Sequence, residues 1–74
     1  MNSPDFSKII WRAPDGTILS CVEKNKVLRE NLQEIRQICQ DALEDAVLMG
    51  GDEQQFRAVL TELVAALVNP YPPQ

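Results

Sequence analysis

Three carboxylates in the second half of the chain have the spacing of one helical face. Asp41, Glu44 and Asp45 stand at positions i, i+3 and i+4, which a helix brings side by side. Such oxygen ligands suit Mg²⁺ or Ca²⁺, but the spacing fits no EF-hand loop, and the Glu-x-x-His motif of di-iron bundles needs histidine, which this chain lacks. We therefore expect a solvated acidic face without a bound metal or cofactor. Cation binding at this cluster is the alternative hypothesis.

The two cysteines stand in different environments. Cys39 falls on an apolar stripe of a predicted helix, where a free cysteine behaves as a small apolar residue. Cys21 stands at the first position of that helix, near Lys24, where a thiol can have a lowered pKa. A nucleophilic thiol needs a positioned base, and the sequence offers none beside Cys21. We expect no catalysis by this chain, and a thiol-dependent site at Cys21 is a second alternative.

Basic side chains gather toward the N-terminus. The basic residues of positions 1–29 are Lys8, Arg12, Lys24, Lys26 and Arg29. Together with Trp11 they form the one candidate patch for nucleic acid. The net charge of −4 and a pI near 4.5 are unlike the basic footprint of a nucleic-acid-binding domain. Weak nucleic-acid binding through this patch is therefore only an alternative to the interpretation below.

Length and composition predict one small domain. The chain has 74 residues, of which 45% are hydrophobic and 24% charged, which is ordinary for a globular domain and unlike a disordered one. The longest apolar run, Val64–Val68, is far shorter than the roughly 20 residues that span a bilayer. The first residues lack the pattern of a signal peptide, so two cysteines favour a reducing compartment. These features predict a cytoplasmic protein without a membrane segment.

The first ordered element is predicted to be a β-hairpin over residues 9–19. A run rich in β-branched and aromatic residues, Ile9–Ala13, precedes Pro14-Asp15-Gly16. Proline suits the first central position of a type I turn, and glycine takes the left-handed conformation that closes a bulged hairpin. In this register Trp11 faces Leu19. Residues 1–8 are predicted to be a flexible leader.

Two helices follow the hairpin. Ser20 and Glu23 have the spacing of a capping box, and no residue breaks a helix before Gly50-Gly51. The first helical element is therefore predicted over 20–49, with Ser20 as its N-cap and helical residues at about 21–49. Asp52 begins a second capping signature, so the second element runs over 52–68, helical at about 53–68, until Asn69-Pro70 ends it. Residues 9–69 thus form a single domain, and 70–74 are a proline-rich tail.

Apolar residues recur along both helices at helical spacing. The stripe on the first helix is Leu28, Leu32, Ile35, Cys39, Ala42, Ala46 and Met49, and the stripe on the second is Phe56, Leu60, Leu63 and Leu67. A two-residue Gly-Gly connection makes the helices antiparallel neighbours. The second helix is shorter and is expected to cover the first only from Met49 back to about position 33. The β-hairpin is expected to cover the start of the first helix, with Trp11 near Leu28 and Leu32.

The apolar set is wider than these two stripes. Leu43 and Val47, among others, lie off them, and a chain below about 80 residues has a thin core, which favours a second subunit. The simplest assembly is a homodimeric four-helix bundle.

An antiparallel dimer would also place the basic start of each long helix beside the acidic end of the other. The alternative is that these charges are solvated faces of little energetic weight.

These patterns together predict a mainly α protein that acts by binding other proteins. We expect a small cytoplasmic protein–protein interaction module, an accessory or regulatory subunit that works as a dimer and has no catalysis of its own. Its partners would be a second copy and an unidentified protein. The residues expected to contact partners are Trp11, Arg12, Lys24, Lys26, Arg29, Leu43 and Val47.

Overall fold

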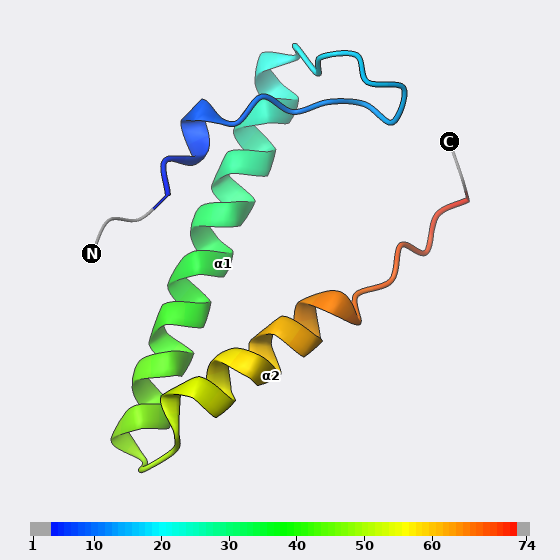
Figure 1. Ribbon diagram of the computed structural model, residues 1–74. Helices are drawn as coiled ribbons and strands as arrows, with labels where there is room; N and C mark the ends of the chain where they lie inside the picture. The colour runs from blue at the N-terminus through cyan, green and yellow to red at the C-terminus, as the bar shows by residue number, and fades with distance from the viewer. Residues whose placement is uncertain (1–3, 73–74) are drawn as a thin grey trace. The chain divides into compact units, whose positions relative to one another are not determined.

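The computed structural model describes residues 4–72, which fold into helices joined by loops and turns. The element order is a 3₁₀ turn, η1 (Phe6–Lys8), a long helix, α1 (Val22–Leu48), and a shorter helix, α2 (Glu53–Ala65) (Figure 1). The mainly helical class, and the order of a long helix, a tight turn and a shorter helix, agree with the sequence prediction. Among residues 4–72, no helix is both long enough and apolar enough to cross a bilayer.

The chain divides into two compact units, and the boundary falls inside α1. The N-terminal unit extends to Gln37, and the C-terminal unit begins at Ile38. The N-terminal unit therefore contains η1, the loop that follows it and the first part of α1. The C-terminal unit contains the last part of α1 and all of α2.

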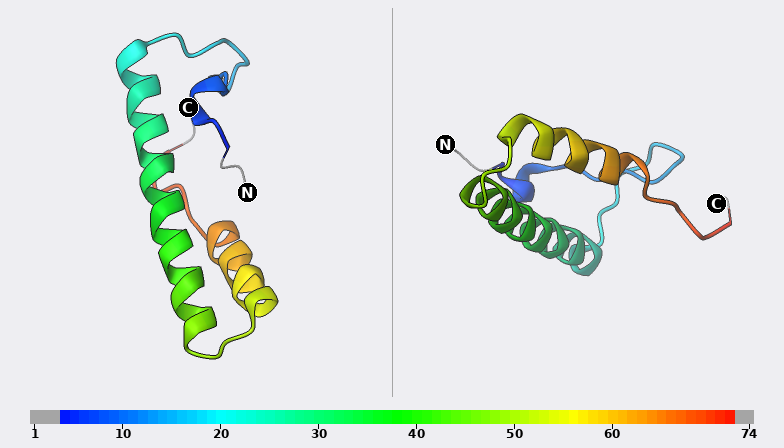
Figure 2. Two further views of the ribbon diagram at one scale, coloured as in Figure 1. Left: turned by 90° about the vertical axis from the view of Figure 1, so that its left-hand side faces the viewer. Right: turned by 90° about the horizontal axis from the view of Figure 1, so that it is seen from below.

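The predicted N-terminal β-hairpin is not formed. Residues 4–72 contain no strand, and the segment between Ile9 and Leu19 runs out and back as a loop (Figures 1 and 2). Its two arms are joined by an isolated antiparallel bridge between Arg12 and Ile18, with hydrogen bonds of 2.8 Å from Ala13 N to Thr17 O and from Leu19 N to Trp11 O. The predicted turn itself is present: Gly16 N donates to Ala13 O at 2.9 Å, and Gly16 has φ +90°.

The pairing of the two arms stops at Trp11 and Leu19, close to the elements on either side. On one side, Asp5 caps η1 by accepting a hydrogen bond from Ser7 N at 3.0 Å, and η1 ends just before the predicted first arm. On the other side, Cys21 already belongs to the start of α1, because its carbonyl accepts from Asn25 N at 3.0 Å. Pairing therefore does not extend to Ile9 and Cys21, and an isolated two-stranded hairpin is marginal in water. Of the predicted flexible leader over residues 1–8, residues 1–3 lie outside the described residues, and 6–8 form η1.

The start of α1 differs slightly from the predicted capping box. The helix begins at Val22, so the N-cap is Cys21 rather than Ser20. The Cys21 thiol takes the place of the capping oxygen and accepts from the backbone N–H of Lys24. Asn25, one turn into the helix, ties the preceding loop to it by donating from Nδ2 to Leu19 O at 3.0 Å.

The end of α1 is set by two glycines with different roles. Gly50 N donates to Val47 O at 3.0 Å and Gly51 N to Ala46 O at 2.8 Å, which is the bonding pattern of a Schellman motif. Gly50 has φ +90°, a left-handed conformation that other residues rarely adopt. At Gly51 the limit is space, because a Cβ there would lie 2.9 Å from Ala46 O.

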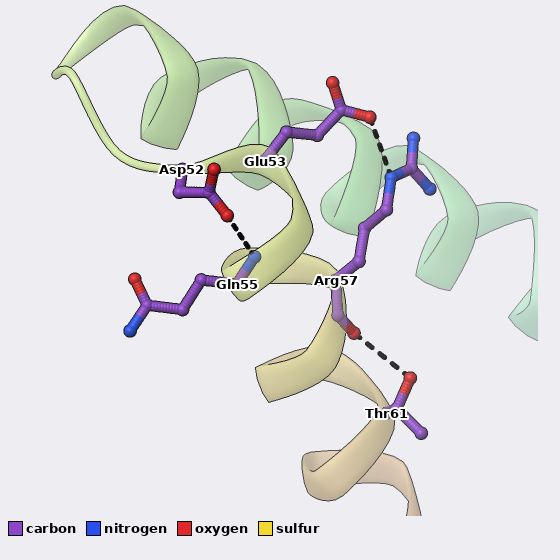
Figure 3. Close-up of polar contacts among 5 residues, drawn as sticks. All are labelled: Asp52, Glu53, Gln55, Arg57 and Thr61. Atoms are coloured by element: carbon purple, nitrogen blue, oxygen red, sulfur yellow. Dashed lines mark hydrogen bonds and ion pairs between the residues drawn. The ribbon is translucent and has the colours of Figure 1, made fainter.

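The start of α2 is fixed by local polar contacts, which Figure 3 shows. Asp52 is the N-cap, and its carboxylate accepts from Gln55 N at 2.7 Å. Arg57 Nε lies 2.9 Å from Glu53 Oε2 in an i,i+4 ion pair, and the Arg57 carbonyl accepts from Thr61 Oγ1 at 3.1 Å. The capping signature predicted for this position is therefore formed.

Helix α2 ends at Ala65 rather than near Val68. Ala66 N donates both to Glu62 O at 3.0 Å and to Leu63 O at 3.2 Å, so the last turn tightens toward 3₁₀ geometry as the helix closes. Beyond it, Asn69 Oδ1 accepts from Tyr71 N at 3.0 Å in a local turn around Pro70. Of the predicted proline-rich tail over residues 70–74, residues 73 and 74 lie outside the described part of the chain.

No side chain within residues 4–72 is buried. The partly buried apolar side chains are Phe6, Trp11, Leu19, Leu28 and Leu32 in the N-terminal unit, and Cys39, Leu43, Phe56 and Leu60, with several alanines, in the C-terminal unit. Only part of each predicted stripe is covered: Ile35 is 53% exposed and Leu63 56%. The apolar faces of both helices thus remain accessible to solvent.

Substituting the two glycines is expected to weaken the α1–α2 connection for two different reasons. Gly50→Ala forces a Cβ into the left-handed region and should lower the free energy of unfolding by about 1 kcal/mol or more. Gly51→Ala pushes its Cβ against Ala46 O and should also destabilise, whereas Gly50→Asn should be milder than Gly50→Ala. Urea denaturation followed by circular dichroism at 222 nm checks this order, and equal stability of all variants would contradict it.

Removing the cap of α2 is expected to cost stability by itself. Asp52→Ala leaves the Gln55 N–H without its acceptor and should reduce the free energy of unfolding by about 1 kcal/mol. Asp52→Asn keeps an acceptor oxygen and serves as the matched control, with most of the stability retained. The same denaturation experiment measures both variants. If Asn proved as damaging as Ala, the capping bond would not be the cause.

Candidate functional site

A cavity of about 260 Å³ lies in the N-terminal unit. Three segments line it: η1, the start of the loop that follows, and the first two turns of α1. These segments are adjacent in space because the loop after η1 runs out and returns, so that the first turns of α1 lie beside η1 (Figure 1). The hydrogen bond from Asn25 to Leu19 O holds the far end of this loop to the same part of α1.

One wall of the cavity is apolar and aromatic. Phe6 and Trp11 are both partly buried and line it together with Ile9 and Val22. Trp11 is the only tryptophan of the chain. Aromatic side chains at such a partly covered position offer a large contact surface to a ligand or a partner at little cost in conformational entropy.

The opposite wall carries two positive charges. Lys26 and Arg29 stand one turn apart on α1, and Arg29 is partly buried. Neither has a hydrogen bond or an ion pair with any residue in the range 4–72. The Asp5 carboxylate has a lowered pKa chiefly because Ser7 donates hydrogen bonds to it, and the charge of Arg29 adds only a minor lowering. Both cations are therefore available to an anionic group.

An amide completes the polar wall. Asn25 donates from Nδ2 to Leu19 O, but its Oδ1 is shielded from solvent and has no hydrogen-bond partner in the described structure. A shielded acceptor without a donor is uncommon in folded proteins and often marks a place where a further group binds. Ser7, which also lines the cavity, has its own hydroxyl bonded to Asp5.

The structure brings together three of the seven residues predicted to contact partners. Trp11, Lys26 and Arg29 line the cavity. Arg12 does not, and instead donates to Gly16 O at 3.0 Å within the turn. Lys24 lines a separate, open and apolar depression of about 360 Å³ with Leu19, Val27 and Leu28. The last two predicted residues belong to the C-terminal unit, where Leu43 is partly buried and Val47 is 49% exposed.

Phe6, Ser7 and Asn25 are site residues that the sequence prediction missed. Phe6 and Ser7 lie in the segment predicted to be a flexible leader. An aspartate such as Asp5 favours a turn in which its side chain accepts from the backbone N–H two residues on, here that of Ser7. This pattern is the sequence feature from which an ordered turn at residues 5–8 could have been predicted. Asn25 has the i,i+4 spacing to Arg29 that places both on one helical face.

The acidic residues of α1 lie on its exposed surface. Asp41, Glu44 and Asp45 are all exposed, and Glu44 accepts a hydrogen bond from Gln40 Nε2 at 2.9 Å. Within the described residues, no three acidic or cysteine side chains lie close enough together to hold a metal ion. The alternative hypothesis of cation binding at this cluster thus gains no geometric support.

Cys21 is exposed at the N-cap of α1 and has a lowered pKa. The main cause is the backbone N–H of Lys24, which donates to the sulfur, and partial desolvation opposes it. Smaller lowering comes from the Glu23 N–H and the charge of Lys24. Cys39 is free and partly buried, as expected for a residue on the apolar stripe.

The Cys21 thiol is expected to titrate below its ordinary pKa in the folded chain. A depressed folded-state pKa means that ionisation of Cys21 adds stability above the pKa of the unfolded thiol, and that this stability is lost as the pH falls through the folded pKa. Thiolate absorbance of the Cys39→Ala variant measures the titration, and the same variant in concentrated urea gives the reference. A folded midpoint at or above the urea value would contradict the capping geometry.

Comparison with known proteins supplies no template for this site. No protein-family model matches the chain, and neither a curated protein nor a solved structure shows a significant similarity to it. An interpretation of function therefore depends on the exposed faces, charges and cavity of this chain alone.

Proposed function

We propose that this protein is a protein–protein interaction module, an accessory or regulatory subunit that works as a homodimer and has no catalysis of its own. The observation that carries the proposal is that no side chain is buried within residues 4–72, although 45% of the chain is hydrophobic. A folded domain without a closed core needs another surface to cover its apolar faces. With two free cysteines, a reducing compartment such as the cytoplasm is the expected place of action.

The C-terminal unit shows the need for a partner most directly. Phe56 and Leu60 of α2 are partly buried, but Val59 is 50% and Leu63 56% exposed, and Val47 of α1 is 49% exposed. Fully burying one such side chain contributes about 1.5–3 kcal/mol. Two helices can cover only the face that each turns toward the other, so these residues favour a second pair of helices.

The distribution of charge favours a second copy in an antiparallel arrangement. From Ile38 onward the sequence has six acidic side chains and a single basic one, Arg57, whereas up to Gln37 it has six basic and five acidic ones. Two C-terminal units facing each other alone would concentrate negative charge. If two α1 helices run antiparallel, the acidic part of each lies beside the basic start of the other, which lowers that repulsion.

Solution mass tests the homodimer. Multi-angle light scattering should give twice 8.3 kDa over a wide concentration range, with weaker association at high salt because the segregated charges are screened. Val47→Lys and Val59→Lys should each shift the mass toward that of a monomer. Lysine is a good helix former, and a cation at Val47 suits the C-terminal end of α1, so weakened helices would not explain the loss.

The matched control places the same charge on an exposed apolar residue outside the proposed face. Ile10 is 64% exposed in the N-terminal loop, and Ile10→Lys should leave the mass unchanged. A wild-type chain that stays at 8.3 kDa at every concentration would overturn the homodimer. Equal effects of Ile10→Lys and Val59→Lys would show that the face was chosen wrongly.

A further inference from the structure

The cavity of the N-terminal unit has the chemistry of a site for a carboxylate. Lys26 and Arg29 project from one helical face and line the same cavity wall, and neither is paired within residues 4–72. An arginine guanidinium binds a carboxylate through two parallel hydrogen bonds, and a neighbouring lysine adds a point charge. Partial burial of Arg29 shields such a pair from solvent and from salt.

The rest of the cavity suits a peptide segment that carries the carboxylate. Trp11 and Phe6 provide an apolar wall for a neighbouring side chain. A volume of about 260 Å³ accommodates a few side-chain atoms and is small beside the pockets that enclose drug-sized molecules.

Nucleic acid fits these features less well. Two unpaired cations line the cavity, whereas electrostatic binding of a nucleic acid uses many phosphate contacts. The net charge of −4 also repels a polyanion at a distance.

From these observations we infer that the cavity binds a short acidic peptide segment of a partner protein, with a carboxylate between Lys26 and Arg29 and an apolar side chain against Trp11. This inference rests on the proposed role as an interaction module, because it names the chemistry of the partner. It does not depend on the homodimer. The apolar dimer face around Val47 and Val59 lies outside the cavity, whereas the charge pairing of an antiparallel dimer would use Lys26 and Arg29. The solution mass is therefore measured for every variant beside its peptide affinity.

The experiment is a titration of the whole chain with acetyl-Leu-Glu-Glu-Leu-amide. Trp11 is the only tryptophan, so its fluorescence reports events in the cavity, and calorimetry measures the affinity independently. We expect saturable binding with a change in the emission of Trp11. The isosteric neutral peptide acetyl-Leu-Gln-Gln-Leu-amide should bind about 10-fold more weakly, since it lacks the charge-assisted hydrogen bonds.

Variants locate the binding on the protein. The double variant Lys26→Gln/Arg29→Gln should weaken the acidic peptide by about 10-fold or more. Lys24→Gln is the control for a cation outside the cavity: it removes one positive charge two residues from Lys26 and should change the affinity by no more than about twofold. Circular dichroism establishes that each variant keeps its helices.

Each contrary outcome is distinct. Equal affinity for the acidic and neutral peptides, or equal losses in the Lys24→Gln and double variants, would overturn carboxylate recognition at this site. Tighter binding of single-stranded oligothymidine with steep salt dependence would assign the cavity to nucleic acid instead. Light scattering on the same samples separates the proposals: peptide binding by a monomer removes the homodimer alone, and a dimer that ignores the acidic peptide removes this inference alone.

Discussion

The rest of the structure depends on one constraint, which is that two helices and a loop cannot enclose a hydrophobic core. A helix presents several faces, and one antiparallel neighbour can cover only one of them. In the C-terminal unit, Phe56 and Leu60 become partly buried while Val59 and Leu63 stay exposed. The described residues of the N-terminal unit, 4–37, likewise include partly buried ones but no buried one. The exposed apolar faces and the accessible cavity both follow from this shortage of covering surface.

Where the apolar faces are left open, local polar bonds define the elements. Asp5 caps η1, Cys21 and Asn25 fix the start of α1, the Schellman motif ends it, and Asp52 starts α2. Each of these contacts lies within a few residues along the chain and needs no tertiary packing. Such a molecule keeps its helices well defined while its larger surfaces remain available, which is the combination that an interaction protein requires.

The features with short-range causes were the ones that the sequence predicted well. Gly50-Gly51 and Asp52 mark the α1–α2 connection because their roles depend on backbone conformation and a cap three residues away. The predicted β-hairpin was wrong because the pairing of its arms stops at Trp11 and Leu19, next to η1 on one side and the start of α1 on the other, and strand propensity does not show how far pairing extends. The cavity itself was not predicted. Trp11, Lys26 and Arg29 were predicted as partner contacts by residue type, whereas Phe6 and Asn25 join them only through the path of the loop.

The position of the boundary between the two units has a consequence for how the chain is dissected. It falls between Gln37 and Ile38, inside the continuous hydrogen-bonded backbone of α1, and not in a linker. Isolated helices need about 12–15 residues or more to persist in water, so a cut at this point leaves two short pieces, each near or below that limit. Neither half can therefore be expressed as a faithful domain, and the smallest useful fragment of this protein is one that keeps α1 whole.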